Sequence, residues 1–384
     1  MDTLDRLNPK FLVTSMRIAA AIALLSLPLW SLSPPAVAGQ EPSATVPCLD
    51  TSATLEELIE CIDPYMLASF DQDLRDGFDV PTADEMLQWR QVVAQMMDGR
   101  CDTIDLGGYD WGGDYTVTTF VDTGIPYCVL LETHYETYDG RDRVTHGWGT
   151  FIYNPGSLRN LSIGAPHPIS DMTTNDEAIG VFKGTRSRTF LLSGGHRQAS
   201  DVVSTCQGTY RRSDAAHDAQ SMFQATVLEL KAYADGHGSE FDHVQFHGMS
   251  TCCTACDVHL SHGSHAPPQA GDKLLELRAA LSRYHPGWRI CMSGDISCSL
   301  DGIENVQGRL LNGVAENEVC SVPAPSTSGH FVHIEQCRDY RLPNDWLPVI
   351  NNTWPLYFYV PFVAQDLTAP AFAEPLQPGD SPTR

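Results

Sequence analysis

The sequence predicts an α/β layer fold, and three observations lead to this class. From about residue 160 onward, short runs rich in β-branched and aromatic residues alternate with longer amphipathic stretches, as in sheets covered by helices. Before residue 155, β-rich runs separated by Asp/Gly turns predict a hairpin-rich region that leads into the main sheet. The chain also has 12 cysteines among its 384 residues. It is therefore long enough for a large core, and disulfides are expected to brace it.

The first 38 residues resemble a signal peptide in composition. Three basic side chains precede an apolar run over residues 18–32, and Ala36-Val37-Ala38 has the small-x-small form that signal peptidase cleaves. The apolar run is shorter than the roughly 20 residues that a bilayer-spanning helix needs. We therefore expect residues 1–38 to be removed, no stable membrane anchor, and a secreted or periplasmic protein.

Residues 39–155 are expected to form a helical and β-rich N-terminal region. Two capping boxes, Thr54 to Glu57 and Thr82 to Glu85, predict the starts of two helices. The second helix continues with apolar residues on one face, which indicates core packing. The β-rich runs expected in this region are 115–121, 127–135 and 148–153.

Residues 156–364 are expected to form the catalytic domain. The runs predicted as strands are 161–164, 189–193, 244–246, 288–290 and 332–335, and the stretches predicted as helices are 176–182, 214–234 and 272–284. At the start of the second of these helices, Ser213 is expected as the N-cap, with His217 on the helix surface. The proline-rich segment 365–384 is expected to be a loose tail.

Charge and cysteine content narrow the choice of partners. The formal net charge is −24, so the surface repels phosphate backbones and anionic lipids, and nucleic acid is not expected as a partner. An even number of cysteines in an oxidising compartment predicts disulfides, although the sequence does not define their pairing.

Polar side chains suited to metal binding follow several predicted strands. His167 and Asp171 come directly after the first strand, and His247 ends the third. Because the carboxyl ends of strands in open α/β sheets gather ligands, one cleft is expected to collect them. Two histidines and a carboxylate are a common ligand set for catalytic zinc, which leaves one position for water. We expect one Zn²⁺ per chain, with Glu177 as the alternative carboxylate ligand.

A separate carboxylate is needed to move protons in such a site. Glu335, at the end of the last predicted strand, is our candidate for the general base and acid. A substrate that carries a carboxylate also needs a fixed cation, for which the arginine fork is suited. Arg197 is the first candidate because it follows a strand end, and Arg188 and Arg186 are the next.

The order of these motifs resembles the zinc carboxypeptidase-type superfamily. It runs from Pro-His-Pro at 166–168 and Gly-His-Arg at 195–197 to Gln-Phe-His-Gly at 245–248 and the stretch 333–341. Within the superfamily, the sequence looks most like the N-formylglutamate amidohydrolases and poly-γ-glutamate hydrolases. The resemblance implies a mixed sheet sandwiched by helices, one catalytic zinc, and hydrolysis of an amide near a carboxylate. This chain has Asp at the fourth position after His167, in place of the carboxypeptidase HxxE pair.

Two other interpretations remain open from the sequence. The segment 252–265, with three cysteines and three histidines, could hold a structural zinc, although disulfides are favoured in an exported protein. The altered ligand spacing also allows a non-catalytic, disulfide-braced extracellular binding protein on a degenerate hydrolase scaffold. The leading hypothesis is an exported zinc-dependent amidohydrolase or peptidase acting on a small-molecule or peptide substrate with a carboxylate. Candidate substrates are an acyl-amino acid, a γ-glutamyl polymer or a cell-wall peptide.

Overall fold

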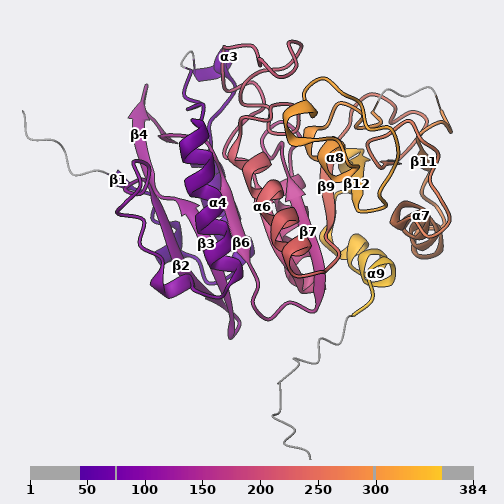
Figure 1. Cartoon of the computed structure of the whole chain (residues 1–384), viewed down its shortest axis with the longest axis horizontal. Coiled ribbons are helices and arrows are strands. Elements are labelled where there is room, and N and C mark those ends of the chain that lie inside the picture. The colour runs from indigo at the N-terminus through magenta and orange to yellow at the C-terminus, as the bar shows by residue number, and fades with distance from the viewer. Residues whose placement is uncertain (1–43, 74–75, 297–299, 357–384) are drawn as a thin grey trace, which may run out of the picture. The chain divides into compact units, whose positions relative to one another are not determined.

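A computed structural model describes residues 44–73, 76–296 and 300–356 (Figure 1). The expected signal peptide (1–38) and loose tail (365–384) lie outside the described residues. In the part of the chain that the structure describes, no helix is long and apolar enough to cross a bilayer.

The centre of the fold is a nine-stranded mixed sheet with the strand order β11-β10-β12-β9-β7-β8-β6-β3-β2. In chain order its strands are β2 (Tyr115–Asp122), β3 (Ile125–Glu132), β6 (Thr150–Tyr153), β7 (Arg159–Ala165), β8 (Ser187–Leu192), β9 (Asp242–Gly248), β10 (Val258–Ser261), β11 (Ile290–Met292) and β12 (Phe331–Gln336). Strands β12, β9, β7 and β8 form a parallel core. The antiparallel strands lie on either side, since β10 pairs with β12, and β6 with β8.

Part of the region before residue 155 belongs to this sheet. Strands β2, β3 and β6 extend the sheet through the pairing of β6 with β8. A smaller three-stranded sheet holds β1 (Ala44–Thr45), β4 (His134–Tyr138) and β5 (Arg141–Val144). The boundary expected after residue 155 therefore falls inside one continuous sheet.

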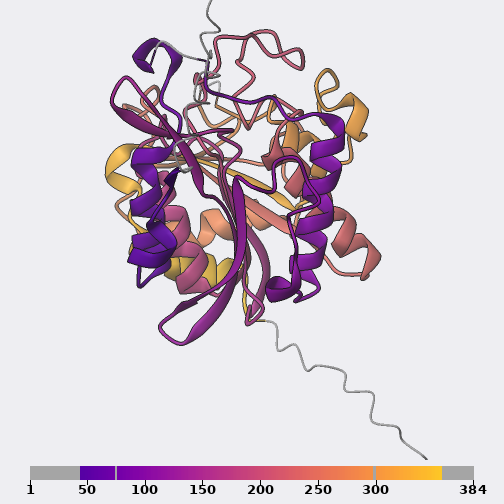
Figure 2. The same ribbon diagram turned by 90° about the vertical axis from the view of Figure 1, so that its left-hand side faces the viewer.

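Helices cover both faces of the large sheet, as Figure 2 shows from its edge. One face carries α4 (Ala83–Met97), α6 (Met222–Gly236) and α8 (Val306–Leu311), which share a core that includes Trp89, Phe223 and Phe331. The other face carries α2 (Leu55–Ile62), α5 (Thr174–Thr185), α7 (Lys273–Tyr284) and α9 (Pro343–Thr353). Two further short helices in the described residues are α1 (Cys48–Thr51) and α3 (Phe70–Asp73). The predicted fold class, a mixed sheet sandwiched by helices, is confirmed.

Local sequence signals predicted where several helices and strands begin. Both capping boxes form, and each threonine side chain accepts a hydrogen bond from the backbone N–H of its glutamate. The helix predicted from residue 214 was placed too early, because α6 begins at Met222 with Ser221 as its N-cap. The strand predicted at 288–290 is β11 at Ile290–Met292, and β10 was not predicted at all.

Disulfides brace the described chain as expected. They join Cys48 to Cys61, Cys101 to Cys128, Cys206 to Cys320, Cys253 to Cys337 and Cys256 to Cys291. Several of them tie loops to the sheet or to each other. Loops that lack regular hydrogen bonding are therefore held by covalent links.

Candidate functional site

The site lies where the chain changes direction across the sheet. From β7 the chain passes through α5 on one face to β8, and from β8 it passes through α6 on the other face to β9. Strands β7 and β8 are neighbours and parallel, and the loops that leave their carboxyl ends lead to helices on opposite faces. Such a switch point leaves a crevice at the carboxyl edge of the sheet. His167 follows β7, His247 lies at the end of β9, and Glu335 pairs directly with His247 in the register of β12.

His167, Asp171 and His247 meet in this crevice. Each offers a ligand-type atom, and these atoms lie within 4.8 Å of one another. The Nδ1 atoms of His167 and His247 are 3.3 Å and 3.6 Å from Oδ2 of Asp171. All three side chains are buried. Asp171 reaches this position because its backbone N–H bonds to the His167 carbonyl, which closes one turn after the strand.

The far side of each imidazole is held by a second residue. His167 Nε2 lies 2.9 Å from Oδ1 of Asp214, and His247 Nε2 lies 3.2 Å from Oε1 of Gln245. In a neutral ring with its hydrogen on Nε2, Nδ1 carries a lone pair that faces Asp171. A metal ion bound there would replace the extra proton that the two carboxylates favour on His167. Metal-ligating histidines are usually oriented in this way by a hydrogen bond on the other ring nitrogen.

The electrostatics of the cluster favour a bound cation. Burial opposes charge on Asp171 and Asp214, yet the neighbouring histidines lower the pKa of both carboxyl groups. Burial also opposes charge on His167, but Asp214 and Asp171 raise its pKa to about 9. Meanwhile Nδ1 of His167 and Oδ1 of Asp171 are buried without a hydrogen-bond partner. Two imidazole nitrogens, a carboxylate and unsatisfied buried ligand atoms fit a zinc ion.

Glu335 lies beside this cluster. Its side chain is buried, and burial together with the nearby Asp171 raises its pKa to about 8. Nε2 of His333 is 3.7 Å from Oε1 of Glu335, and the His333 ring centroid is 4.3 Å from that of His247. A carboxylate with a pKa near neutrality is suited to accept a proton and to release it again.

A cavity of about 220 Å³ opens onto these residues. Its lining comprises His167, Arg197, Tyr210, His217, His247, Leu300, Gly302, Ile303, Glu304, His333 and Glu335. Arg197 is the one Lys or Arg among these lining residues, and its side chain is 43% exposed. Its Nη2 is 3.8 Å from Oδ1 of Asp171, so the guanidinium stands at the cavity mouth near the cluster.

The other two predicted substrate-binding arginines lie elsewhere. Arg186 follows α5 and donates to the Gly156 carbonyl, and Arg188 is near the start of β8. These positions are at the amino ends of the strands, about 20 Å from the carboxyl edge by strand length. Arg188 lines a different cavity, with Asn160 and Asp242. The structure does not bring Arg186 and Arg188 into the cleft that Arg197 lines, because both lie at the opposite end of the strand that Arg197 follows.

Glu177, the alternative metal ligand, points to the opposite face. Its Oε2 accepts a hydrogen bond of 2.7 Å from Gln336, the residue after Glu335. Successive side chains of a strand alternate between faces, so a partner of Gln336 is separated by the sheet from Glu335. Burial raises the pKa of Glu177 well above its usual value, which favours the uncharged acid. No group of closely spaced ligand-type side chains in the described ranges includes Glu177.

Several residues of the site were not predicted from the sequence. Asp214 and His217 lie in a turn, where Oδ1 of Asp214 is 2.8 Å from Nδ1 of His217. The Tyr210 ring stacks on His217 with centroids 3.7 Å apart. The sequence carried one signal for the turn, since Ser213 and Asp214 are typical helix-capping residues. Only the fold shows that a loop, and not a helix surface, follows them.

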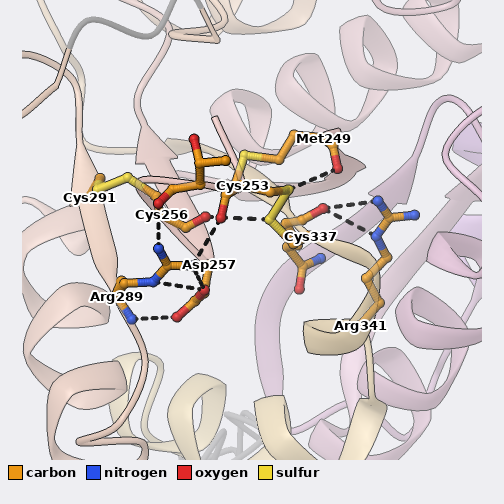
Figure 3. The surroundings of a disulfide bond; sticks show 10 residues. Met249, Cys253, Cys256, Asp257, Arg289, Cys291, Cys337 and Arg341 are labelled. Carbon is orange, nitrogen blue, oxygen red and sulfur yellow. Dashed lines mark hydrogen bonds and ion pairs between the residues drawn. A yellow bond between two sulfur atoms is a disulfide. The ribbon is translucent and has the colours of Figure 1, made fainter. Parts of the chain in front are cut away.

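A disulfide joins the two strands that carry the reactive side chains. Cys253 follows His247 and β9, and it is bonded to Cys337, which directly follows β12 (Figure 3). Arg289 supports the same loop by donating to the carbonyls of Cys253 and Thr254 and by pairing with Asp257. The disulfide therefore ties together the segments that follow β9 and β12.

The structural-zinc interpretation of segment 252–265 is wrong. Cys253 and Cys256 form disulfides with Cys337 and Cys291, and Cys252 is disulfide-bonded as well. A disulfide sulfur is not a thiolate, so these residues offer no zinc ligand. Within the same segment His259 lies on β10, buried and 3.4 Å from Asp301.

Comparisons with known proteins find no matching family model and no matching curated protein. Among solved structures, a gene product of Agrobacterium tumefaciens is 10% identical with a TM-score of 0.29, over 50% of this chain and 86% of that one. A putative carboxypeptidase A from Shewanella denitrificans is 12% identical with a TM-score of 0.31, over 62% and 77% of the two chains. A metallo-carboxypeptidase from Pseudomonas aeruginosa, in complex with (2-guanidinoethylmercapto)succinic acid, is 11% identical with a TM-score of 0.31, over 71% and 69%.

Proposed function

We propose that this protein is an exported zinc-dependent hydrolase that cleaves an amide bond near a carboxylate. The observation that carries the proposal is the meeting of His167 Nδ1, His247 Nδ1 and the Asp171 carboxylate at one buried point, with Glu335 beside it. These residues come from three strand ends that are far apart in sequence. Their meeting at the switch point of the sheet is the arrangement expected of an active site.

The roles of the residues follow from their positions. His167, Asp171 and His247 would hold the zinc ion, which when bound lowers the pKa of water and polarises a carbonyl group. Glu335 accepts a proton from the attacking water at its carboxylate and later delivers it to the leaving nitrogen. Its raised pKa, about 8, allows both steps near neutral pH. Asp214 keeps the His167 ring oriented throughout.

Arg197 supports the choice of substrate class. Its guanidinium stands at the mouth of the cavity, where it would pair with a substrate carboxylate. The volume of about 220 Å³ suits a small acyl-amino acid or one end of a longer chain. An acyl-amino acid, a γ-glutamyl polymer and a cell-wall peptide all have an amide near a carboxylate.

Export is supported by the cysteine chemistry. The described cysteines are engaged in disulfides, which persist in oxidising compartments. We propose that cleavage after Ala38 releases the mature protein to the periplasm or the medium. Intact-mass measurement of the protein from an exporting host should show a chain that begins at Gly39, and a retained N-terminal segment would contradict this.

Metal analysis of the purified mature protein tests the proposed function. We expect one zinc per chain after exchange into metal-free buffer, loss of that zinc in His247→Ala, and hydrolysis of at least one of the three substrate types. Glu335→Gln should keep the zinc but reduce turnover by about 10²–10⁴-fold. A wild-type protein without bound metal, or His247→Ala with unchanged activity, would refute the proposal. Metal binding without any hydrolysis would favour the non-catalytic binding protein.

A further inference from the structure

A buried network of amide side chains lies behind His247, between β9 and helix α8. Gln245 is at its centre, and all four of its side-chain hydrogen-bond positions have partners. Its Oε1 faces Asn305 Nδ2 at 2.6 Å and His247 Nε2 at 3.2 Å. Its Nε2 faces Gln307 Oε1 at 3.1 Å and His243 Nε2 at 3.2 Å. A buried amide that is satisfied on every side has one orientation, because a flip would place donors against donors.

The orientation of the network is set by a backbone group whose role is unambiguous. The N–H of Gly308, in the first turn of α8, donates to Oδ1 of Asn305 at 2.8 Å. A backbone N–H only donates, so this side of the Asn305 amide must be its oxygen. The other side is then the NH₂ group, which donates to Gln245. The atom of Gln245 that receives this bond must be its oxygen, Oε1.

The same oxygen faces the ring of His247. Because Gln245 Oε1 only accepts, Nε2 of His247 must carry the hydrogen, and Nδ1 must carry the lone pair. Nδ1 is the atom that faces Asp171, at 3.6 Å. A second backbone group, at the other end of the network, independently fixes the same orientation of the Gln245 amide. The carbonyl of Ala215 accepts from Nε2 of Gln307 at 2.9 Å, which leaves Oε1 of Gln307 to accept from Gln245.

We propose that the first turn of α8 sets the tautomer of His247, through Asn305 and Gln245, and so prepares Nδ1 as a metal ligand. The role of Nδ1 as a metal ligand rests on the proposed function, whereas the tautomer of His247 follows from the hydrogen-bond network alone. Asn305 and Gln245 are positioning residues, since they act through His247. They lie 60 residues apart in sequence, and their contact makes α8 a part of the site although none of its residues lines the cavity.

Asn305→Asp is the substitution that tests this. Aspartate still caps α8, since it accepts from the Gly308 N–H as asparagine does, and it is an equally good N-cap residue. It has no NH₂ group to offer Gln245, so two acceptor oxygens would face each other at this contact. Gln307, held by the Ala215 carbonyl, opposes a turn of the Gln245 amide, so Gln245 must either turn against Gln307 or move away. In both cases Nε2 of His247 loses the acceptor that fixes its hydrogen, and Nδ1 is no longer held as the lone-pair atom. We expect the zinc affinity, measured by competition with a chromophoric chelator, to fall by about 10–100-fold.

Asn154→Asp is the matched control. Asn154 is also buried, accepts from the backbone N–H of Gly156 and donates to the Ser187 carbonyl, but it lies at the other end of the sheet. The substitution makes the same chemical change and should leave the zinc affinity within about two-fold of wild type. Equal losses in both variants would show a general effect of a buried charge and overturn the proposal. So would an unchanged affinity in Asn305→Asp.

Ring ¹⁵N spectra of the metal-free wild-type protein give a readout that needs neither a variant nor a bound metal. The His247 signals, assigned by comparison with His247→Ala, should show a hydrogen on Nε2 and none on Nδ1. A hydrogen on Nδ1 would overturn the inference even if zinc binds. Conversely, the expected spectrum in a protein that binds no zinc would contradict the proposed function and leave the tautomer inference intact.

Discussion

At the scale of single residues, the site depends on shared carboxylates. Oδ1 of Asp214 receives both Nε2 of His167 and Nδ1 of His217, at 2.9 Å and 2.8 Å. One anion thus orients a proposed ligand and a cavity-lining ring together. Because these contacts are buried, their electrostatic strength exceeds that of surface pairs.

Asp214→Asn should therefore weaken zinc binding by about 10–100-fold, since a neutral amide holds the His167 ring less strongly and no longer raises its basicity. Chelator competition measures the change. Asp218→Asn is the control, because Asp218 is equally buried and close in sequence but bonds to Gln220 and not to a proposed ligand. Similar affinities in the two variants would remove Asp214 from the metal site.

Gly248 shows how tightly the base of the site is packed. A Cβ at this position would lie 2.3 Å from the Arg341 guanidinium. That guanidinium is buried and donates to the carbonyls of Asp171, Met172 and Gln336, so it has little room to move. The absence of a side chain at 248 therefore allows Arg341 to support the loop that holds Asp171.

Gly248→Ala is expected to destabilise the protein by about 1–3 kcal/mol through this overpacking. It should also lower zinc affinity, since the Asp171 loop must shift. Urea denaturation and chelator competition measure the two effects. Gly236→Ala, where a new Cβ meets nothing within 4 Å, should leave both nearly unchanged. A stable Gly248→Ala with normal zinc binding would contradict the packing argument.

At the scale of elements, β9 and β12 are held together in two ways. Their backbones are hydrogen-bonded as neighbouring strands, and a disulfide joins the segments that follow them. The Cys253–Cys337 bond links the segments that follow β9 and β12, 84 residues apart. The proposed ligand His247 and the proposed base Glu335 lie side by side at these ends. The disulfide restricts relative movement of the two groups.

Replacement of both Cys253 and Cys337 by alanine should reduce the free energy of unfolding by about 2–4 kcal/mol, because it releases a long loop in the unfolded chain. It should also reduce turnover more than it reduces zinc content, since Glu335 lies outside the proposed ligand set. The matched variant lacks Cys48 and Cys61, which are 13 residues apart and far from the site. That variant should lose stability but keep the turnover of its folded fraction. Equal loss of turnover in both would show that stability alone is responsible.

At the scale of the whole molecule, a histidine joins segments that are distant in sequence. The ring of His146 is 2.8 Å from Asp79 and 2.9 Å from Asp114, and its backbone N–H donates to Glu132. Burial disfavours the charged ring, but Asp79, Glu132 and Asp114 outweigh it and raise the pKa of His146 to about 9. The folded state therefore holds a proton that the unfolded chain releases near pH 6.5.

This proton makes stability depend on pH with a defined sign. The contribution of His146 is complete below about pH 6.5 and is lost as the pH rises through about 9. On the order of 2 kcal/mol should disappear across this range. The free energy of unfolding, measured by denaturant unfolding, should decrease between about pH 6.5 and 9.5 in the wild type. In His146→Gln this decrease should be smaller by about 2 kcal/mol over the same window of about three pH units. Parallel curves for the two proteins would show that His146 carries no extra proton.

Local sequence signals were sufficient where a few neighbouring residues determine the structure. The capping boxes at Thr54 and Thr82 form because the partners of each bond are three residues apart. The runs around residues 163, 190, 244 and 334 became strands because alternate residues, among them Ile163, Phe190, Val244 and Ile334, are apolar and pack into one core on the same face of the sheet. The rule that ligands gather at strand ends likewise pointed to His167, His247 and Glu335.

Tertiary structure alone decided which strand ends share an edge and which face each side chain meets. It separated Arg197 from Arg186 and Arg188, although all three flank one strand, because the two ends of a strand lie far apart. It separated Glu335 from Glu177, because adjacent residues of β12 point to opposite faces. It also supplied Asp214, which contacts His167 across 47 residues of sequence, and Asn305, which contacts Gln245 beside His247 across 60. Sequence spacing carries no record of such contacts, since they arise only when the sheet order is set.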